Sequence, residues 1–182
     1  MVSAAPRSRE APAEPAARVP SLGLLRHGIA ESSGGDPGLT QAGIETVRAE
    51  ALGLARIGLT FDWIACSPLR RAHQTAQLLA ETLTPGSEAE VVQALAPGCR
   101  LTSIPGLLAR HQRARAILLV GHQPDLGGIA AGLIGARSAF HLGRGDLCWF
   151  ELDRWPSPGE LDEPPSATLK MVLPATVIEA LG

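Results

Sequence analysis

The chain of 182 residues has little lysine, little cysteine and no long apolar run. Lys170 is the only lysine among 16 basic residues and the formal net charge is -2, so no polybasic strip is available to bind nucleic acid or a membrane surface. Three scattered cysteines (Cys66, Cys99 and Cys148) argue against a disulfide framework or a zinc site and favour a reducing cytoplasm. We therefore expect a cytoplasmic protein in which a few arginines do any binding of phosphate.

The ends and the length of the chain indicate how it is organised. No apolar run approaches the ~20 residues that span a bilayer, and residues 1–9 lack the apolar segment of a secretory signal. Residues 1–20 are built almost entirely from Ala, Pro, Arg, Glu and Ser, a composition typical of a flexible leader. We expect a leader over residues 1–20, and a single globular domain over residues 21–182 that acts as a monomer.

Short apolar runs alternate with helical patterns along this domain. One helix is predicted to begin after Thr40 and to end at Gly58, a second begins at Ser67, and a third runs from an Asp125 cap to Gly135. The alternation predicts an α/β fold, with a mostly parallel sheet covered by helices on both faces. The predicted strands are Leu22–Leu25, Trp63–Cys66, Ile117–Val120, Leu147–Leu152 and Thr168–Leu173.

Polar residues stand where three of these strands end. Arg26 and His27 follow the first strand, and His122 follows the third. The carboxyl ends of parallel strands form the ligand crevice of an open α/β sheet, so the two histidines are expected to face each other there. The second strand leads into a helix start, where free N–H groups favour an anion. At about 100° per residue, Arg71 flanks the apolar face of that helix and reaches the crevice, whereas Arg70 points to solvent.

Four blocks of the sequence resemble a known family. They are LLRHGIAE at 24–31, LTQAG at 39–43, SPLRRAHQTA at 67–76 and LLVGHQPDL at 118–126. In order and spacing they resemble the histidine phosphatase superfamily, and within it the small phosphohistidine phosphatases of the SixA type. The resemblance implies a phosphoglycerate mutase-like three-layer α/β/α sandwich without a large cap domain. It also implies that His27 is the phosphorylated nucleophile and that Arg26, Arg71 and His122 form the phosphate pocket.

The chemistry of these side chains agrees with those roles. A neutral His27 can attack phosphorus through one ring nitrogen if a carbonyl or a carboxylate, such as that of Glu31, holds the other. Arg26 and Arg71 lower its pKa and grip the phosphoryl oxygens, and His122 adds a donor as charge builds up. Water then cleaves the phosphohistidine, and no metal or cofactor is required. Two glycines beside the histidines, Gly28 and Gly121, are further candidates for substrate binding.

Two departures from the family pattern bear on the substrate. Pro37-Gly38 stands where this branch usually carries Arg-Pro. The stretch 93–98 has no carboxylate where larger relatives place a general acid, which leaves Asp125 as the one nearby acid. An imidazole leaving group needs less help from an acid than an alkoxide does. The sequence thus favours a phosphatase acting on phosphohistidine in a protein, with a small phosphomonoester or a silent phosphate-binding module as the alternatives.

The other histidines and the proline-rich segment are expected to play no part in the chemistry. His73, His111 and His141 have the setting of surface or packing residues. Residues 156–165 contain four prolines and are expected to form an exposed loop between the last two strands.

Overall fold

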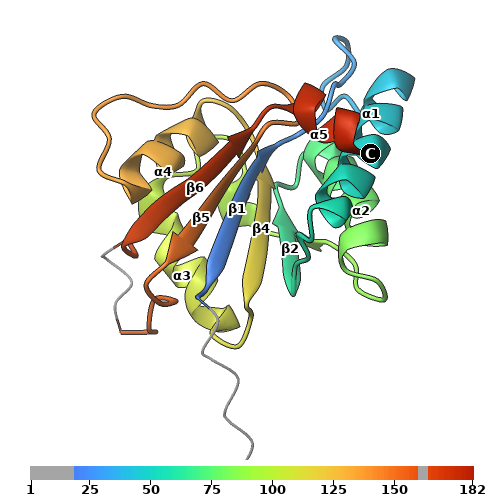
Figure 1. Cartoon of the computed structure of the whole chain (residues 1–182). Helices are drawn as coiled ribbons and strands as arrows, with labels where there is room; N and C mark the ends of the chain where they lie inside the picture. Colours follow the sequence, from blue (N-terminus) through green and yellow to red (C-terminus); the bar gives the residue numbers. More distant parts are fainter. Residues whose placement is uncertain (1–18, 160–163) are drawn as a thin grey trace, which may run out of the picture.

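The computed structural model describes residues 19–159 and 164–182. Helices and strands alternate over most of this length, as Figure 1 shows. The strands are β1 (Ser21–Arg26), β2 (Trp63–Cys66), β3 (Glu90–Val91), β4 (Ala116–Gly121), β5 (Leu147–Leu152) and β6 (Ala167–Leu173). The helices are α1 (Gln41–Arg56), α2 (Arg70–Leu83), α3 (Ile104–Leu108), α4 (Asp125–Leu133) and α5 (Ala175–Leu181), with 3-10 turns at Gln93–Leu95, Leu101–Ser103 and Ala109–His111.

The strands form one mixed sheet in the order β3-β2-β4-β1-β5-β6. β3, β2, β4 and β1 run parallel, whereas β5 is antiparallel to both β1 and β6. The three strands that precede the predicted functional residues, β1, β2 and β4, are therefore adjacent and point the same way. This arrangement brings their carboxyl ends to one edge of the sheet.

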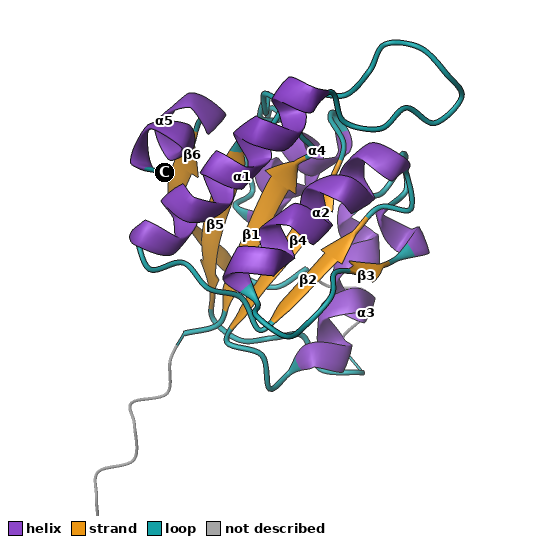
Figure 2. Ribbon diagram, turned by 90° about the vertical axis from the view of Figure 1, so that its right-hand side faces the viewer, coloured by secondary structure: helices purple, strands orange, loops and turns teal. Residues whose placement is uncertain are grey.

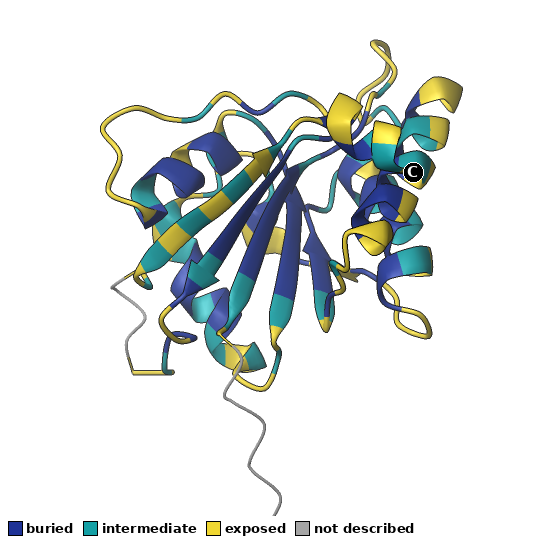
Figure 3. Ribbon diagram, viewed as in Figure 1, coloured by how far each residue is buried: buried dark blue, intermediate teal, exposed yellow. Residues whose placement is uncertain are grey.

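Helices cover both faces of the sheet, so the fold is a three-layer α/β/α sandwich (Figures 1 and 2). Alternate residues of the inner strands enter opposite cores, because side chains along a strand point to opposite faces. Ile117 and Leu119 of β4 pack in one core with residues of α3 and α4, whereas Leu118 and Val120 pack in the other with residues of α1, α2 and α5. Figure 3 shows the buried inner strands, and β6 alternates between partly buried and exposed residues.

The predicted fold class is confirmed, and each predicted strand agrees with the structure to within one residue at either end. Thr40 caps α1, since its side chain accepts a hydrogen bond from Gly43 N, and Gly58 has the expected positive φ of 79°. The prediction missed β3, α3 and α5, which are short. The predicted cap of α4 is wrong: Pro124 is the N-cap, and no side chain caps the helix.

The predicted leader and the proline-rich loop lie partly outside the described residues. Residues 1–18 and 160–163 are not described. Pro20, the last residue of the predicted leader, accepts a hydrogen bond from Leu152 N and so already belongs to the fold. Within residues 19–159 and 164–182, no helix combines the length and the apolar character needed to cross a membrane.

Candidate active site

The predicted polar residues meet at the carboxyl edge formed by β1, β4 and β2. Arg26, the last residue of β1, pairs with Gly121, the last residue of β4. His27 N then donates to Gly121 O across 3.1 Å, and Ser67 N donates to Val120 O across 3.0 Å. The three strands therefore end at the same level of the sheet, which places His27, His122 and the start of α2 next to one another.

His27 is held in one orientation by both of its ring nitrogens. Its Nδ1 lies 2.8 Å from Gly28 O, and its Nε2 lies 3.1 Å from Nε of Arg71. A carbonyl oxygen can only accept, so we assign the ring proton to Nδ1. Nε2 then carries the lone pair, which accepts the N–H of Arg71.

Thr75 of α2 fixes the turn that carries His27. Gly28 N donates to Thr75 Oγ1 across 3.0 Å, and the Thr75 hydroxyl donates to Arg71 O across 2.7 Å. A Cβ at Gly28 would lie only 2.7 Å from Val47 Cγ2, so the turn packs tightly on α1. The N–H of Gly28 therefore already has an acceptor inside the protein. The carbonyl of Gly121 likewise already accepts the N–H of His27. Both glycines thus support the site through backbone hydrogen bonds, and neither of these two groups is free to bind a substrate.

His122 lies beside His27, with their ring centroids 5.2 Å apart and the planes at 57°. Its Nε2 is 2.7 Å from Oγ of Ser67, which also accepts the N–H of Leu69 at 3.3 Å. We assign the hydroxyl proton of Ser67 to this contact, so that Nε2 accepts it and the ring proton of His122 lies on Nδ1. That Nδ1 is buried and, among the described residues, has no hydrogen-bond partner.

Arg26 completes the set of predicted residues at this edge. One terminal nitrogen of its guanidinium donates to Leu142 O across 2.7 Å, which anchors the side chain. Its Nε is buried and has no partner among the described residues. With this tautomer, Arg26 and His122 each keep one buried N–H that has no acceptor in residues 19–159 and 164–182, and such unsatisfied donors are rare in folded proteins.

Burial and the two arginines keep both histidines neutral. Burial, with smaller effects of His122, Arg71 and Arg26, lowers the pKa of His27 from 6.5 to about 4, against an opposing effect of the Gly28 carbonyl. Burial and the same arginines lower the pKa of His122 to about 4, and the carboxylate of Asp36 opposes them. At neutral pH, His27 therefore keeps the lone pair that a nucleophile needs.

The two adjacent arginines of α2 have different surroundings, as the helical geometry predicts. Arg71 bonds to His27, whereas Arg70 is exposed at the surface. The backbone N–H of Arg70 is not free to bind an external anion, because both carboxylate oxygens of Asp36 accept it at 3.0 Å. Asp36 Oδ1 also lies 4.0 Å from a terminal nitrogen of Arg71. Sequence reasoning missed Asp36, which belongs to a short polar loop with no distinguishing motif.

The two auxiliary acids that the sequence suggested have other surroundings among the described residues. Glu31 is exposed, and the ring of His27 is oriented by Gly28 O instead. Asp125 Oδ2 accepts the N–H of Gly98 across 2.7 Å, so this carboxylate ties α4 to the loop before the second 3-10 turn. Of the acids considered, Asp36 is the one that the fold brings next to an arginine of the site.

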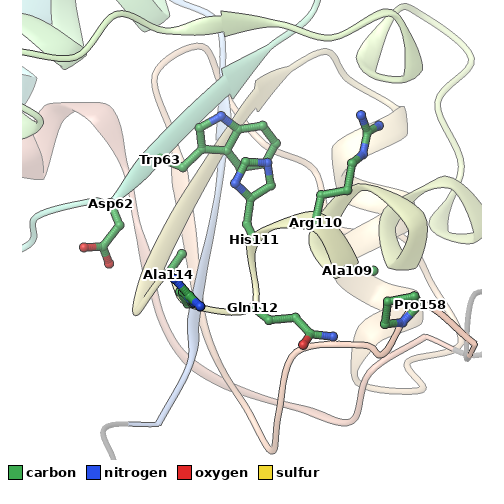
Figure 4. A pocket seen from close by; sticks show the side chains of 9 residues that line it. Asp62, Trp63, Ala109, Arg110, His111, Gln112, Ala114 and Pro158 are labelled. Atoms are coloured by element: carbon green, nitrogen blue, oxygen red, sulfur yellow. The ribbon is translucent and has the colours of Figure 1, made fainter.

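Other features of the described residues are separate from this site. No group of three or more His, Cys, Asp or Glu residues among them is placed to hold a metal ion. A hollow at the opposite end of the sheet is lined by Trp63, the first residue of β2, and by His111 (Figure 4). Their rings stack with centroids 3.6 Å apart, so His111 is a packing residue as predicted.

Comparison with known proteins gives the family. The model of the histidine phosphatase superfamily (branch 1) matches residues 22–96, the part that contains His27 and Arg71. The chain belongs to the histidine phosphatase superfamily. An uncharacterized protein of Picosynechococcus sp. (strain PCC 7002) is 38% identical over 128 residues, which cover 66% of this chain and 77% of that relative.

Solved structures of two phosphatases share the fold. The protein histidine phosphatase SixA, complexed with tungstate, matches with a TM-score of 0.73 and 20% identity, over 86% of this chain and 97% of SixA. The phosphoserine phosphatase of Entamoeba histolytica, in complex with 3-phosphoglyceric acid, matches with a TM-score of 0.59 and 19% identity, over 84% of this chain and 95% of that enzyme. At such identities the likeness concerns the architecture.

Proposed function

We propose that this chain is a metal-independent phosphatase that forms a phosphohistidine at His27 and removes phosphate from phosphohistidine in a protein. The observation that carries the proposal is the state of the His27 ring. With Nδ1–H held by Gly28 O, the lone pair of Nε2 is directed to the side where Arg71 lies. A neutral, oriented imidazole between arginines is what nucleophilic attack on phosphorus requires.

The neighbouring donors fit a phosphoryl group. Nε of Arg26 and Nδ1 of His122 are buried and lack acceptors in the described part of the chain. Oxygens of a bound phosphoryl group would satisfy both, and the guanidinium of Arg71 would turn from His27 to a third oxygen. These donors would stabilise the charge that spreads over the equatorial oxygens in the transition state, which is how most phosphoryl-transfer catalysis works.

The reaction then runs in two steps. Nε2 of His27 forms a bond to phosphorus while the bond from phosphorus to the leaving group breaks. When the leaving group is the imidazole of another histidine, it departs with its own ring protonated and needs little help from an acid. Water next attacks the phosphohistidine, which releases inorganic phosphate and restores neutral His27.

A small phosphomonoester is the second candidate substrate. The structural likeness to a phosphoserine phosphatase supports it, since related folds cleave such esters. The surroundings of Asp125 favour the first candidate, because its carboxylate is bonded to Gly98 N. With this carboxylate already bonded, the site is better suited to a leaving group that departs easily.

A substrate panel tests the proposal. Phosphohistidine peptides, aryl phosphates and alkyl phosphates should be compared with the wild-type protein and with His27→Ala. We expect the phosphohistidine peptides to give the highest kcat/KM, and the variant to lose all turnover. Equal rates on all three classes would favour the phosphomonoesterase. Tight phosphate binding without turnover would identify a silent binding module.

A further inference from the structure

A carboxylate stands at the outer rim of the site, on loop 31–38. The two ends of this loop lie side by side: Glu31 N donates to Gly38 O, and Ala30 and Leu39 form an isolated β-bridge. Beyond this neck, most of the loop is exposed. The carboxylate of Asp36 contacts the start of α2, where it accepts the N–H of Arg70 with both oxygens. Asp36 is therefore held in a defined place.

The guanidinium of Arg71 lies between His27 and Asp36. Its Nε contacts Nε2 of His27 at 3.1 Å, and its terminal nitrogen lies 4.0 Å from Asp36 Oδ1. His27 is 7% exposed, whereas the side chains of Arg71 and Asp36 are 21% and 46% exposed. Exposure rises along this line, so Asp36 lies on the solvent side of the site.

In-line transfer places the leaving group on this same side. The bond that breaks at phosphorus points away from the attacking Nε2 of His27, and the leaving group therefore occupies the outer part of the site. The negative charge of Asp36 also acts on the buried part of the site, since it raises the pKa of His122 against the lowering effect of the arginines.

We infer that Asp36 is a specificity-determining residue, which disfavours substrates that carry a carboxylate close to the phosphate and favours neutral or cationic leaving groups. This inference rests on the proposed function and names its substrate class. An imidazole beside the phosphate is neutral or positive, and so meets no repulsion from Asp36. Phosphoserine as a free amino acid, or a phosphoglycerate, would bring a carboxylate to the rim. Like charges brought together in this way lower affinity.

A matched pair of substrates isolates this effect. 3-Carboxyphenyl phosphate and 3-carbamoylphenyl phosphate have the same shape and differ in one charge. Asp36→Asn removes the rim charge and keeps an oxygen that can accept the N–H of Arg70. We expect this variant to shift the kcat/KM ratio toward the carboxylated substrate by about three- to tenfold, mainly through KM, as expected for two exposed charges roughly 7 Å apart that interact mostly through water.

Glu31→Gln is the control, because it removes a charge from an exposed position of the same loop. It should leave the substrate ratio unchanged. Asp36→Glu should keep the wild-type preference, because the charge is retained. In the wild-type protein, raising the salt concentration should weaken the discrimination against the carboxylated substrate, and this measurement needs no variant. A ratio that is the same in the wild-type protein and in Asp36→Asn would overturn the inference.

Binding measurements separate this inference from the proposed function. The dissociation constants of the two corresponding phenylphosphonates, which cannot be hydrolysed, should show the same shift in Asp36→Asn by calorimetry. A shift in binding without any turnover in the wild-type protein would support the role of Asp36 and refute the phosphatase. Turnover with an unshifted ratio would do the reverse. Failure of both phosphonates to bind, together with no turnover of either phosphate, would refute both.

Discussion

Arg71 donates from Nε to Nε2 of His27 across 3.1 Å, although 44 residues separate them in the sequence. The contact occupies the lone pair that would attack phosphorus, so the guanidinium stands where a phosphoryl group would bind. Arg71 therefore holds the nucleophile in place before the substrate arrives and would bind the phosphoryl oxygens afterwards.

Arg71 and Arg70 should differ sharply on substitution. We expect Arg71→Ala to lower kcat/KM for an aryl phosphate by about 100-fold or more, because it removes a charge-assisted donor of the transition state. Arg70→Ala removes an exposed side chain and should change kcat/KM by less than about threefold. Steady-state kinetics of the two purified variants checks this. Equal losses would show that the pocket does not discriminate between the two faces of α2.

The ring titrations of His27 and His122 should lie well below the ordinary range. Their pKa values are lowered from 6.5 to about 4, mainly by burial. NMR titration of the free protein should therefore find both rings neutral at pH 5.5. Midpoints near 6.5 would contradict the electrostatic description of the site.

The same shifts predict how stability depends on pH. Between pH 6.5 and about 4, the unfolded chain binds protons that the folded rings do not, so these two histidines make the free energy of unfolding fall as the pH falls through this window. The double variant His27→Gln with His122→Gln should lose less stability over that range. Urea unfolding at several pH values measures it. A pH dependence identical to that of the wild-type protein would contradict the prediction.

Glu50 should weaken the fold at alkaline pH. It is fully buried in α1, neither carboxylate oxygen has a hydrogen-bond partner among the described residues, and burial together with Glu179 and Asp146 raises its pKa to about 8. The folded state thus binds a proton that the unfolded state releases above pH 4.5, and stability falls as the pH rises from there to 8. Glu50→Gln should be more stable than the wild-type protein at pH 8, by roughly 1 to 3 kcal/mol.

The matched control for Glu50 is Glu45→Gln, which alters an exposed carboxylate of the same helix. It should leave the pH dependence unchanged. Unfolding by urea at pH 5 and at pH 8 gives both comparisons. If Glu50→Gln were no more stable than the wild-type protein at pH 8, the carboxyl group would have a partner that the described contacts lack.

Asp125 should not act as the acid of the reaction. Its carboxylate is bonded to Gly98 N, so rates should depend steeply on leaving-group basicity in the wild-type protein and in Asp125→Asn alike. Measuring kcat/KM for a series of aryl phosphates and for glycerophosphate tests this. A flat dependence in the wild-type protein that becomes steep in the variant would make Asp125 the general acid.

Sequence reasoning predicted the parts of the fold that depend on local patterns. The inner strands are short runs of buried aliphatic residues, and α1 has a capping threonine, an apolar face and a glycine after its last turn. β3 has two exposed residues, and α3 and α5 have five and seven residues, too few to establish a period. These elements form because the neighbouring sheet and helices provide partners.

The candidate site likewise combines residues that local sequence patterns predict with residues that depend on contacts between distant parts of the chain. His27, His122 and Arg71 were expected together because strand ends and a helical face follow from the sequence. Asp36 was not expected, because its contact with Arg70 N spans 34 residues and depends on the path of an exposed loop. The ring of His122 is oriented by the contact of its Nε2 with the hydroxyl of Ser67, which is 55 residues away in the sequence. Contacts of this kind leave no local pattern.

The most direct test of the account is to trap the phosphorylated protein. Wild-type protein mixed with a labelled phosphate donor and quenched in alkali should carry label that is stable to base and released by acid, as a phosphohistidine is. Peptide mapping should place this label at His27, and His27→Ala should carry none. Label at another residue, or turnover by the wild-type protein without any labelled intermediate, would contradict the account.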